Sequence, residues 1–172
     1  MTPDLKNFIR KCQHCNQTET YLLPLDPGTA RLVVEIARGI RAKGINAIHP
    51  RKEIEPTGAL SSNDVGNLSR PHRHGLIAKV KGNPGNWLLT SKGAVFLRGE
   101  PVPRYAVVSK VTGHQIGYAE PEKYRTTLRD LVGQDFPWEG IGFDIQGGQV
   151  VRTLEDLKTP KPRQTETASL GI

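Results

Sequence analysis

A helix-period pattern of apolar residues is the clearest signal in the first half of the chain. Apolar side chains between Asp26 and Gly44 recur at spacings that place them on one helix face: Leu32, Val33, Ile36, Ala37 and Ile40. Asp26 can accept an amide N–H at the start, and Pro27 fits the first helical position. Gly44 is the residue type that ends a helix. The pattern therefore predicts an amphipathic helix between Asp26 and Gly44, with Arg31, Arg38 and Arg41 off its apolar face.

A second helix is expected over residues 62–74. The preceding Ser-Ser-Asn-Asp at 61–64 has the capping-box pattern, in which a hydroxyl and a carboxylate three residues later satisfy each other's backbone amides. Val65 and Leu68 then face inward. Pro71 removes the amide that would bond to the carbonyl of Asn67, so we expect the helix to kink or break near Pro71. A short helix over 51–54 is expected to precede it.

Strand signals flank glycine-containing turns at three places, and each pair predicts a hairpin. The predicted hairpins pair 77–81 with 86–89, 105–111 with 115–118, and 141–145 with 149–153. Further helices are expected to start at Thr90 or Ser91, ending at Gly99, and at Pro121, the latter with Tyr124, Leu128 and Leu131 on one face.

Helices and hairpins in this order predict an α+β chain made of four segments. These are an N-terminal cysteine knuckle at 1–25, a core domain at 26–104, a small β-rich extension at 105–158, and a tail at 159–172 that we expect to be disordered. The sequence has no apolar run of the roughly 20 residues that a membrane span needs. It also lacks a secretory signal, so we expect a cytoplasmic protein with reduced thiols.

The net charge of +7 is concentrated in one part of the chain. Residues 61–110 carry eight basic and two acidic side chains, whereas residues 111–172 carry seven basic and nine acidic ones. A local basic excess attracts a polyanion over about 8–10 Å at physiological salt. The excess coincides with the predicted helix and hairpin at 62–89, which favours nucleic acid as the partner over a merely solvated surface.

The residues that end this helix and build this hairpin resemble a known family. Gly75-Leu76-Ile77 at the helix end, Leu89-Thr90 at the end of the second strand, and Gly93 in the next helix resemble winged helix-turn-helix proteins of the multiple-antibiotic-resistance-regulator type. The likeness covers about residues 29–99. The chain is also similar to bacterial and phage proteins with a Cys-x-x-Cys segment just before the first helix. The resemblance implies a DNA-binding winged helix-turn-helix core with a β-rich C-terminal extension.

In such folds the recognition helix enters the major groove of double-stranded DNA, and the hairpin, called the wing, contacts the backbone. Ser62, Asn63 and Asn67 are the candidates for base contact. Asparagine pairs with adenine, and serine can contact either a base or a phosphate. Arg70 and Arg73 follow the break at Pro71 and are expected to meet phosphates. The candidates on the wing are Lys79, Lys81 and Asn83. The chain is expected to be a transcriptional regulator that acts as a homodimer on a two-fold DNA site.

Cys12 and Cys15 form half of a zinc site. Zinc in structural sites takes four ligands, and the chain has no other cysteine. A second copy of the chain would complete four sulfurs across a dimer. A redox dithiol and a pair that binds no metal are the alternatives, and all three stay open from the sequence.

The sequence also bears on two other classes of function, an enzyme and a protein-interaction module. The chain has no nucleophile elbow, no phosphate-cradling loop and no His pair with metal-binding spacing, so we expect no enzyme. The alternative to DNA binding is a winged-helix module that binds proteins in a larger phage or transcription-associated assembly, with the mildly acidic C-terminal third as the contact surface.

Overall fold

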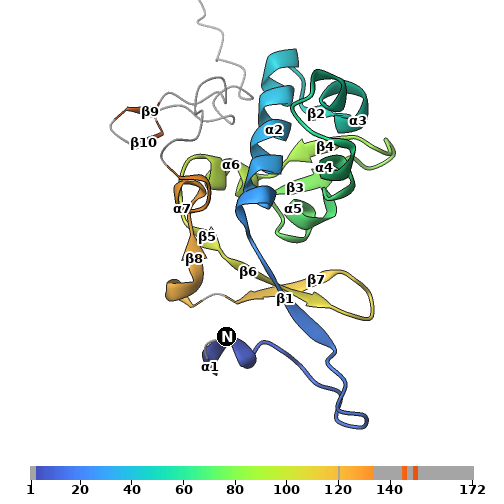
Figure 1. Ribbon diagram of the computed structural model, residues 1–172, viewed down its shortest axis with the longest axis vertical. Helices are drawn as coiled ribbons and strands as arrows, with labels where there is room; N and C mark the ends of the chain where they lie inside the picture. Colours follow the sequence, from blue (N-terminus) through green and yellow to red (C-terminus); the bar gives the residue numbers. More distant parts are fainter. Residues whose placement is uncertain (1–2, 120, 134–144, 147–148, 151–172) are drawn as a thin grey trace, which may run out of the picture.

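The structure is a computed structural model, and it describes residues 3–119, 121–133, 145–146 and 149–150. It belongs to the α+β class, with helices packed around a three-stranded sheet and a second three-stranded sheet beside them (Figure 1). The predicted disordered tail at 159–172 and most of the predicted hairpin at 141–153 lie outside the described residues. Among the helices described, none is both long and apolar enough to cross a membrane.

The longest described helix, α2 (Pro27–Lys43), is the centre of the core, and its predicted caps are confirmed. The carboxylate of Asp26 accepts the amide of Thr29 at 2.7 Å, and Gly44 ends the helix with a φ of 63°. The apolar face is fully buried: Ala30, Leu32, Val33, Val34, Ile36, Ala37 and Ile40. The expected amphipathic pattern therefore packs as predicted, with the arginines off the buried face.

Four short helical segments follow α2 across a two-residue strand, β2 (Ala47–Ile48). They are α3 (Pro50–Glu53), η1 (Glu55–Thr57), α4 (Ser62–Gly66) and α5 (Ser69–Arg73). The capping box at Ser61 and Asp64 is present as predicted.

The predicted break near Pro71 is confirmed, and it falls three to four residues before the proline, at Asn67 and Leu68. Proline cannot donate to the carbonyl of Asn67, and its ring disfavours a helical carbonyl there. That carbonyl accepts the amide of Arg70 at 2.9 Å instead.

The first sheet has the order β2-β4-β3 and is antiparallel throughout. The predicted hairpin is confirmed, with β3 (Ile77–Lys79) and β4 (Trp87–Leu89) joined by the turn over 80–86. Thr90 then caps α6 (Ser91–Leu97), accepting the amide of Gly93 at 3.0 Å. Ile77, Leu89 and Phe96 join the buried face of α2 in one core.

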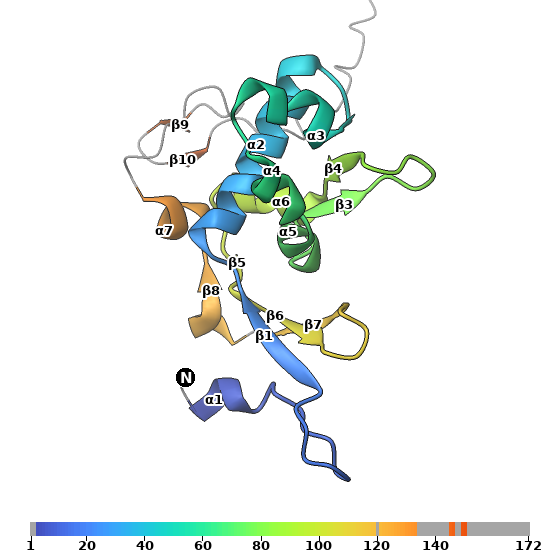
Figure 2. The ribbon, with the colours of Figure 1, turned by 45° about the vertical axis from the view of Figure 1, so that its right-hand side comes forward.

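The second sheet pairs a strand from before the core with two strands that follow it in the chain. Its order is β1-β6-β7, formed by β1 (Thr20–Pro24), β6 (Tyr105–Ser109) and β7 (Gln115–Ala119). The β6–β7 hairpin is confirmed, whereas the strand in the N-terminal segment was not expected. The sheet, the cysteine loop and a short α1 (Pro3–Lys6) lie at the opposite end of the molecule from α3 (Figures 1 and 2).

The single helix predicted from Pro121 is wrong. The chain forms a 3-10 turn, η2 (Glu122–Tyr124), then strand β8 (Arg125–Thr126), which pairs with β5 (Val102–Pro103), and then α7 (Leu128–Val132). Thr127 and Asp130 form a capping box at the start of α7. The backbone of a capping residue is extended, so a helix that began at Pro121 could not continue through Thr127. At 145–150, β9 (Ile145–Gln146) pairs with β10 (Gln149–Val150).

Gly93 lets α6 approach the start of β3 closely. A side chain at this position would overlap the carbonyl oxygen of Leu76 and lie 2.7 Å from Leu89. We predict that Gly93→Ala lowers the free energy of unfolding by about 1–3 kcal/mol through overpacking. Gly66→Ala is the matched control, because nothing lies within 4 Å of a Cβ there and alanine stabilises a helix by up to about 1 kcal/mol. Urea unfolding measures both, and equal effects would contradict the close approach.

His74 ends α5 inside the core, with 1% of its surface exposed. Neither ring nitrogen makes a hydrogen bond of normal geometry with the described residues. Burial lowers the pKa of His74 to about 4; the charges of Lys92 and Arg70 act in the same direction, and the Pro24 carbonyl and Asp26 oppose it. The ring is therefore neutral in the folded protein at neutral pH.

This burial predicts a loss of stability in mild acid. Below pH 6.5 the unfolded chain protonates His74 and the folded chain does not, so the free energy of unfolding falls by about 3 kcal/mol between pH 6.5 and pH 4. His74→Leu should flatten this dependence, whereas His14→Gln, at an exposed position, should leave it intact. Urea unfolding at a series of pH values measures the slope. An unchanged slope in His74→Leu would mean that another group causes the loss.

Candidate nucleic-acid interface

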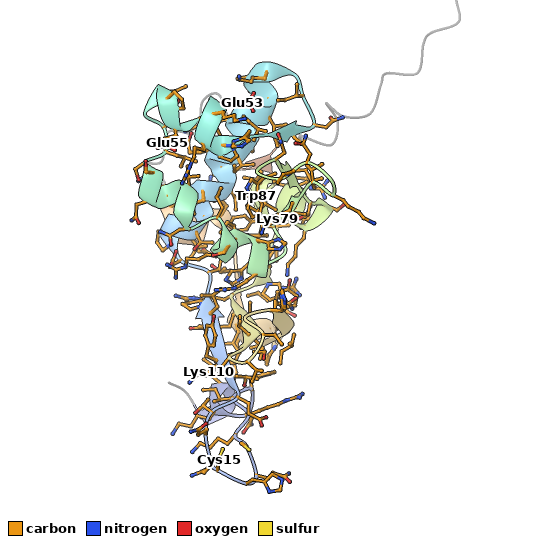
Figure 3. All side chains as sticks on the ribbon, turned by 90° about the vertical axis from the view of Figure 1, so that its right-hand side faces the viewer. Cys15, Glu53, Glu55, Lys79, Trp87 and Lys110 are labelled. Carbon is orange, nitrogen blue, oxygen red and sulfur yellow. The ribbon has the colours of Figure 1, made fainter. Side chains whose placement is uncertain are left out.

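The predicted contact residues lie on α4, α5 and the β3–β4 hairpin, which share one side of the molecule. Figure 3 faces this side, with Glu55 at the upper left, Lys79 and Trp87 near the middle, and Lys110 and Cys15 at the lower end. Most of the predicted residues are exposed: Ser62, Asn63, Asn67, Lys79, Lys81 and Asn83. Arg70 and Arg73 are half-buried.

The three polar residues predicted to read bases differ in their contacts. The side-chain amide of Asn67 donates to the carbonyl of Asn63 at 3.0 Å, which ties it to its own helix. The hydroxyl of Ser62 donates to the carboxylate of Glu55 on η1. A base contact by Ser62 or Asn67 would have to replace these bonds. The side chain of Asn63, in the first turn of α4, is exposed.

Arg70 holds two elements together. Its guanidinium lies 2.6 Å from the carboxylate of Asp26, the N-cap of α2. Partial burial opposes the ionisation of Asp26, but hydrogen bonds from Thr29 and the charge of Arg70 outweigh it and lower the pKa of Asp26. Both side chains are about one-third exposed, so a third group can still reach the guanidinium. The structure therefore gives Arg70 an intramolecular role that the sequence did not suggest.

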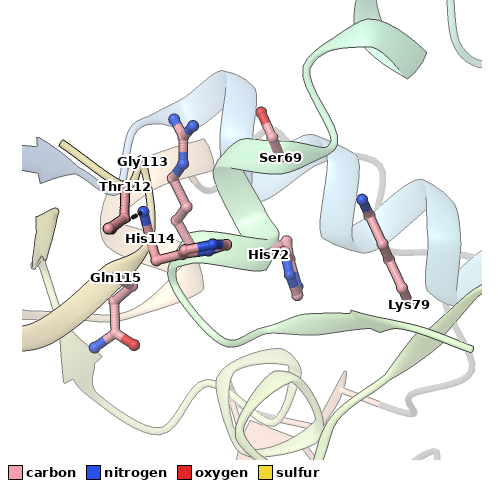
Figure 4. Close-up of a pocket in the computed structure, with 8 residues that line it drawn as sticks. Ser69, His72, Lys79, Thr112, Gly113, His114 and Gln115 are labelled. Carbon is pink, nitrogen blue, oxygen red and sulfur yellow. Dashed lines mark hydrogen bonds between the residues drawn. The ribbon is translucent and has the colours of Figure 1, made fainter. Parts of the chain in front are cut away.

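Arg73 points away from α4 and toward the second sheet. Its Nη1 donates to the hydroxyl of Tyr21 on β1 at 3.4 Å. It lines a hollow of about 390 Å³ between α5, β3 and the turn of the β6–β7 hairpin, which Figure 4 shows. The full lining is Ser69, His72, Arg73, Lys79, Thr112, Gly113, His114 and Gln115. The hairpin residues were not predicted, because nothing in the sequence places this turn beside α5.

Trp87 fixes the base of the predicted wing. It is 9% exposed and packs in the main core, so its ring is a packing element. The ring of His72 meets it edge-on at 5.6 Å between centroids, and Lys79 Nζ lies 5.5 Å from its centre. At the tip, the side-chain oxygen of Asn83 accepts a hydrogen bond from the side-chain amide of Asn86 at 2.8 Å, which orders the turn. The wing is thus anchored at its base, and Lys81 is exposed near its tip.

Cys12 and Cys15 lie in a tight turn at the far end of the second sheet. The amide of Cys12 donates to Gln17 at 2.8 Å, its carbonyl accepts Asn16 at 2.9 Å, and Asn16 is left-handed with a φ of 57°. The described residues bring no third Cys, His, Asp or Glu to the pair. The two thiols would provide two of the four ligands that a structural zinc takes, and zinc binding across a dimer remains a prediction.

The turn around Cys12 lowers the pKa of its thiol. The backbone amides of Cys15 and His14 and the thiol of Cys15 donate to its sulfur and lower the pKa of Cys12. We predict that iodoacetamide alkylates Cys12 at a lower pH in the folded protein than in urea, because the thiolate is the nucleophile. Peptide mass spectrometry of the wild type and of Cys15→Ser measures how the alkylation of Cys12 depends on pH. Identical profiles in the folded and unfolded chain would rule out the amide contacts. Elemental analysis of the same sample tests for one zinc per two chains.

Comparison with known proteins adds no relative. No protein-family model matches the chain, and none of the curated proteins or solved structures gives a significant match. Any function must therefore be argued from the arrangement of the exposed side chains. Polar and basic side chains of α5, β3 and the β6–β7 turn come together around the hollow, and further polar side chains are exposed on α4 and on the β3–β4 hairpin.

Proposed function

We propose that the protein binds double-stranded DNA as a winged helix-turn-helix regulator of transcription. The order of elements supports this assignment: α2, β2, α3, α4 with α5, and then the β3–β4 hairpin, with β2 pairing to β4. This is the order expected of a winged helix, in which α4 and α5 form the recognition helix and residues 80–86 the wing. This order of elements supports the winged-helix interpretation of the core.

One observation carries the proposal. The helix α4 and the β3–β4 hairpin lie on the same side of the molecule (Figure 1), and Asn63 in the first turn of α4 is exposed, as are Lys79 and Lys81 on the hairpin. Asn63 would contact a base edge in the major groove, since asparagine pairs with adenine through two hydrogen bonds. Lys79 and Lys81 would contact the phosphate backbone. The tight Arg70–Asp26 pair would hold α5 against α2 while the face is occupied.

The proposal predicts separable effects for base and phosphate contacts. Asn63→Ala should weaken binding to a selected site by about 1–3 kcal/mol and leave binding to random DNA unchanged. Lys81→Glu should weaken both, and reduce the salt slope of log K by about 0.9 per phosphate lost. Site selection from random duplex DNA, followed by fluorescence anisotropy at several salt concentrations, measures these effects.

The control is Arg129→Glu, which makes the same charge change on α7. This helix lies on the other side of the molecule from the hairpin tips in both ribbon views (Figures 1 and 2). It should bind almost like the wild type. A wild-type protein that binds no duplex at about 50 mM salt would overturn the proposal and favour the protein-interaction module. Parallel losses in Arg129→Glu and Lys81→Glu would mean that only the net charge matters. Equilibrium sedimentation with and without the site tests the homodimer.

A further inference from the structure

The hollow beside α5 has the chemistry of an anion site. Its lining includes a guanidinium from Arg73 and an ammonium from Lys79, together with the imidazoles of His72 and His114. Hydroxyl groups of Ser69 and Thr112 complete the polar set, and no carboxylate occurs among the lining residues. Hydrogen bonds from charged donors to phosphate oxygens are short and about twice as strong as neutral ones.

The β6–β7 turn is held in place next to α5 by specific contacts. The hydroxyl of Tyr118 on β7 donates to the carbonyl of His74 at 3.0 Å. A Cβ on Gly113 would lie 3.7 Å from Nη2 of Arg73, so the turn and the guanidinium are neighbours. The turn is therefore fixed to the end of α5 instead of projecting freely from the second sheet.

The turn is also ordered internally. The side-chain oxygen of Ser109 accepts the amides of Val111 at 3.2 Å and Thr112 at 3.3 Å. The oxygen of Thr112 accepts the amide of His114 at 3.2 Å. Figure 4 shows the result, with Thr112 and His114 on one side of the hollow and His72 and Lys79 on the other.

On the α5 side of the hollow, hydrogen bonds to other parts of the protein orient the side chains of His72 and Arg73. His72 Nδ1 donates to the carbonyl of Ile77 at 3.1 Å, because a carbonyl can only accept. This bond orients the ring and leaves Nε2 as its other polar edge. Arg73 is steadied by Tyr21 and lies in the wall between α5 and the turn.

We propose that this hollow binds a backbone phosphate of duplex DNA, with the β6–β7 turn as a contact outside the winged helix. The inference rests on the proposed DNA binding, because the hollow is continuous with α5 and β3. The DNA backbone would leave the recognition helix and pass over the hollow toward the second sheet. The phosphate would lie among Arg73, Lys79 and His114. The protected length of DNA would therefore exceed that of the α4–α5 and wing contacts alone.

The test compares His114→Glu with the control Arg129→Glu on random-sequence duplex DNA. His114 is exposed, and a carboxylate in the hollow would repel a phosphate. We expect roughly tenfold weaker binding and a salt slope reduced by about 0.9, as for one lost phosphate contact. Hydroxyl-radical footprinting on the selected site, where the protein has a fixed register, should lose protection at backbone positions on one flank only. Thr112→Glu places the same charge on the turn and replaces His114→Glu if thermal unfolding shows that the latter fails to fold.

The outcomes separate this inference from the proposed function. If Lys81→Glu weakens binding but both turn variants bind and footprint like Arg129→Glu, the phosphate site is wrong and DNA binding stands. If the wild-type protein binds no duplex, both are overturned. Loss of affinity for the turn variants with the flank still protected would also overturn the site, since the effect would then be long-range charge alone.

Discussion

Burial of one face of α2 is the constraint on which the rest of the fold depends. The helix carries seven buried apolar side chains, and strands, helices and the start of α6 pack around them. A short α3, a broken α4–α5 and a three-stranded sheet would each be marginal alone, because brief helices and small sheets gain their stability from tertiary packing. The exposed face on α4 and the hairpin therefore takes its geometry from the core behind it.

The break before Pro71 shows how one residue arranges several contacts. The missing amide ends α4 at Gly66 and lets α5 start again at Ser69. The new direction brings Arg70 to Asp26, Arg73 to Tyr21, and His74 into the core. The three side chains stand at positions i, i+3 and i+4 of α5 and therefore share one face, and the break sets the direction of that face independently of α4. Burial of His74 opposes the stability of this arrangement, because neither nitrogen of its ring makes a hydrogen bond of normal geometry among the described residues.

Features set by neighbouring residues could be predicted from the sequence, whereas features that depend on residues far apart in the chain could not. The caps of α2 and α4, the break at Pro71, and the two described hairpins follow from residue types that act on their own neighbours. The helix expected from Pro121 failed, because pairing of β8 with β5 competes with helix formation and depends on residues far away in the chain. The same holds for the candidate site. Exposure of Asn63 and Lys81 was expected, whereas the Arg70–Asp26 pair and the turn beside α5 required the tertiary fold.

The pairing of β1 with β6 has a consequence for how the chain is made. Thr20 pairs with Ser109, so the cysteine turn rests on a strand that leaves the ribosome long after it. Until β6 is synthesised, β1 has no partner, and an unpaired apolar strand edge invites association with other chains. Closing so long a loop also lowers the entropy of the chain, and the contacts that offset this loss form only once the core has brought the two segments together. The N-terminal segment is therefore not a detachable module: a chain cut after residue 104 would expose the edge of β1 and would also remove Leu128 of α7 from the core around α2.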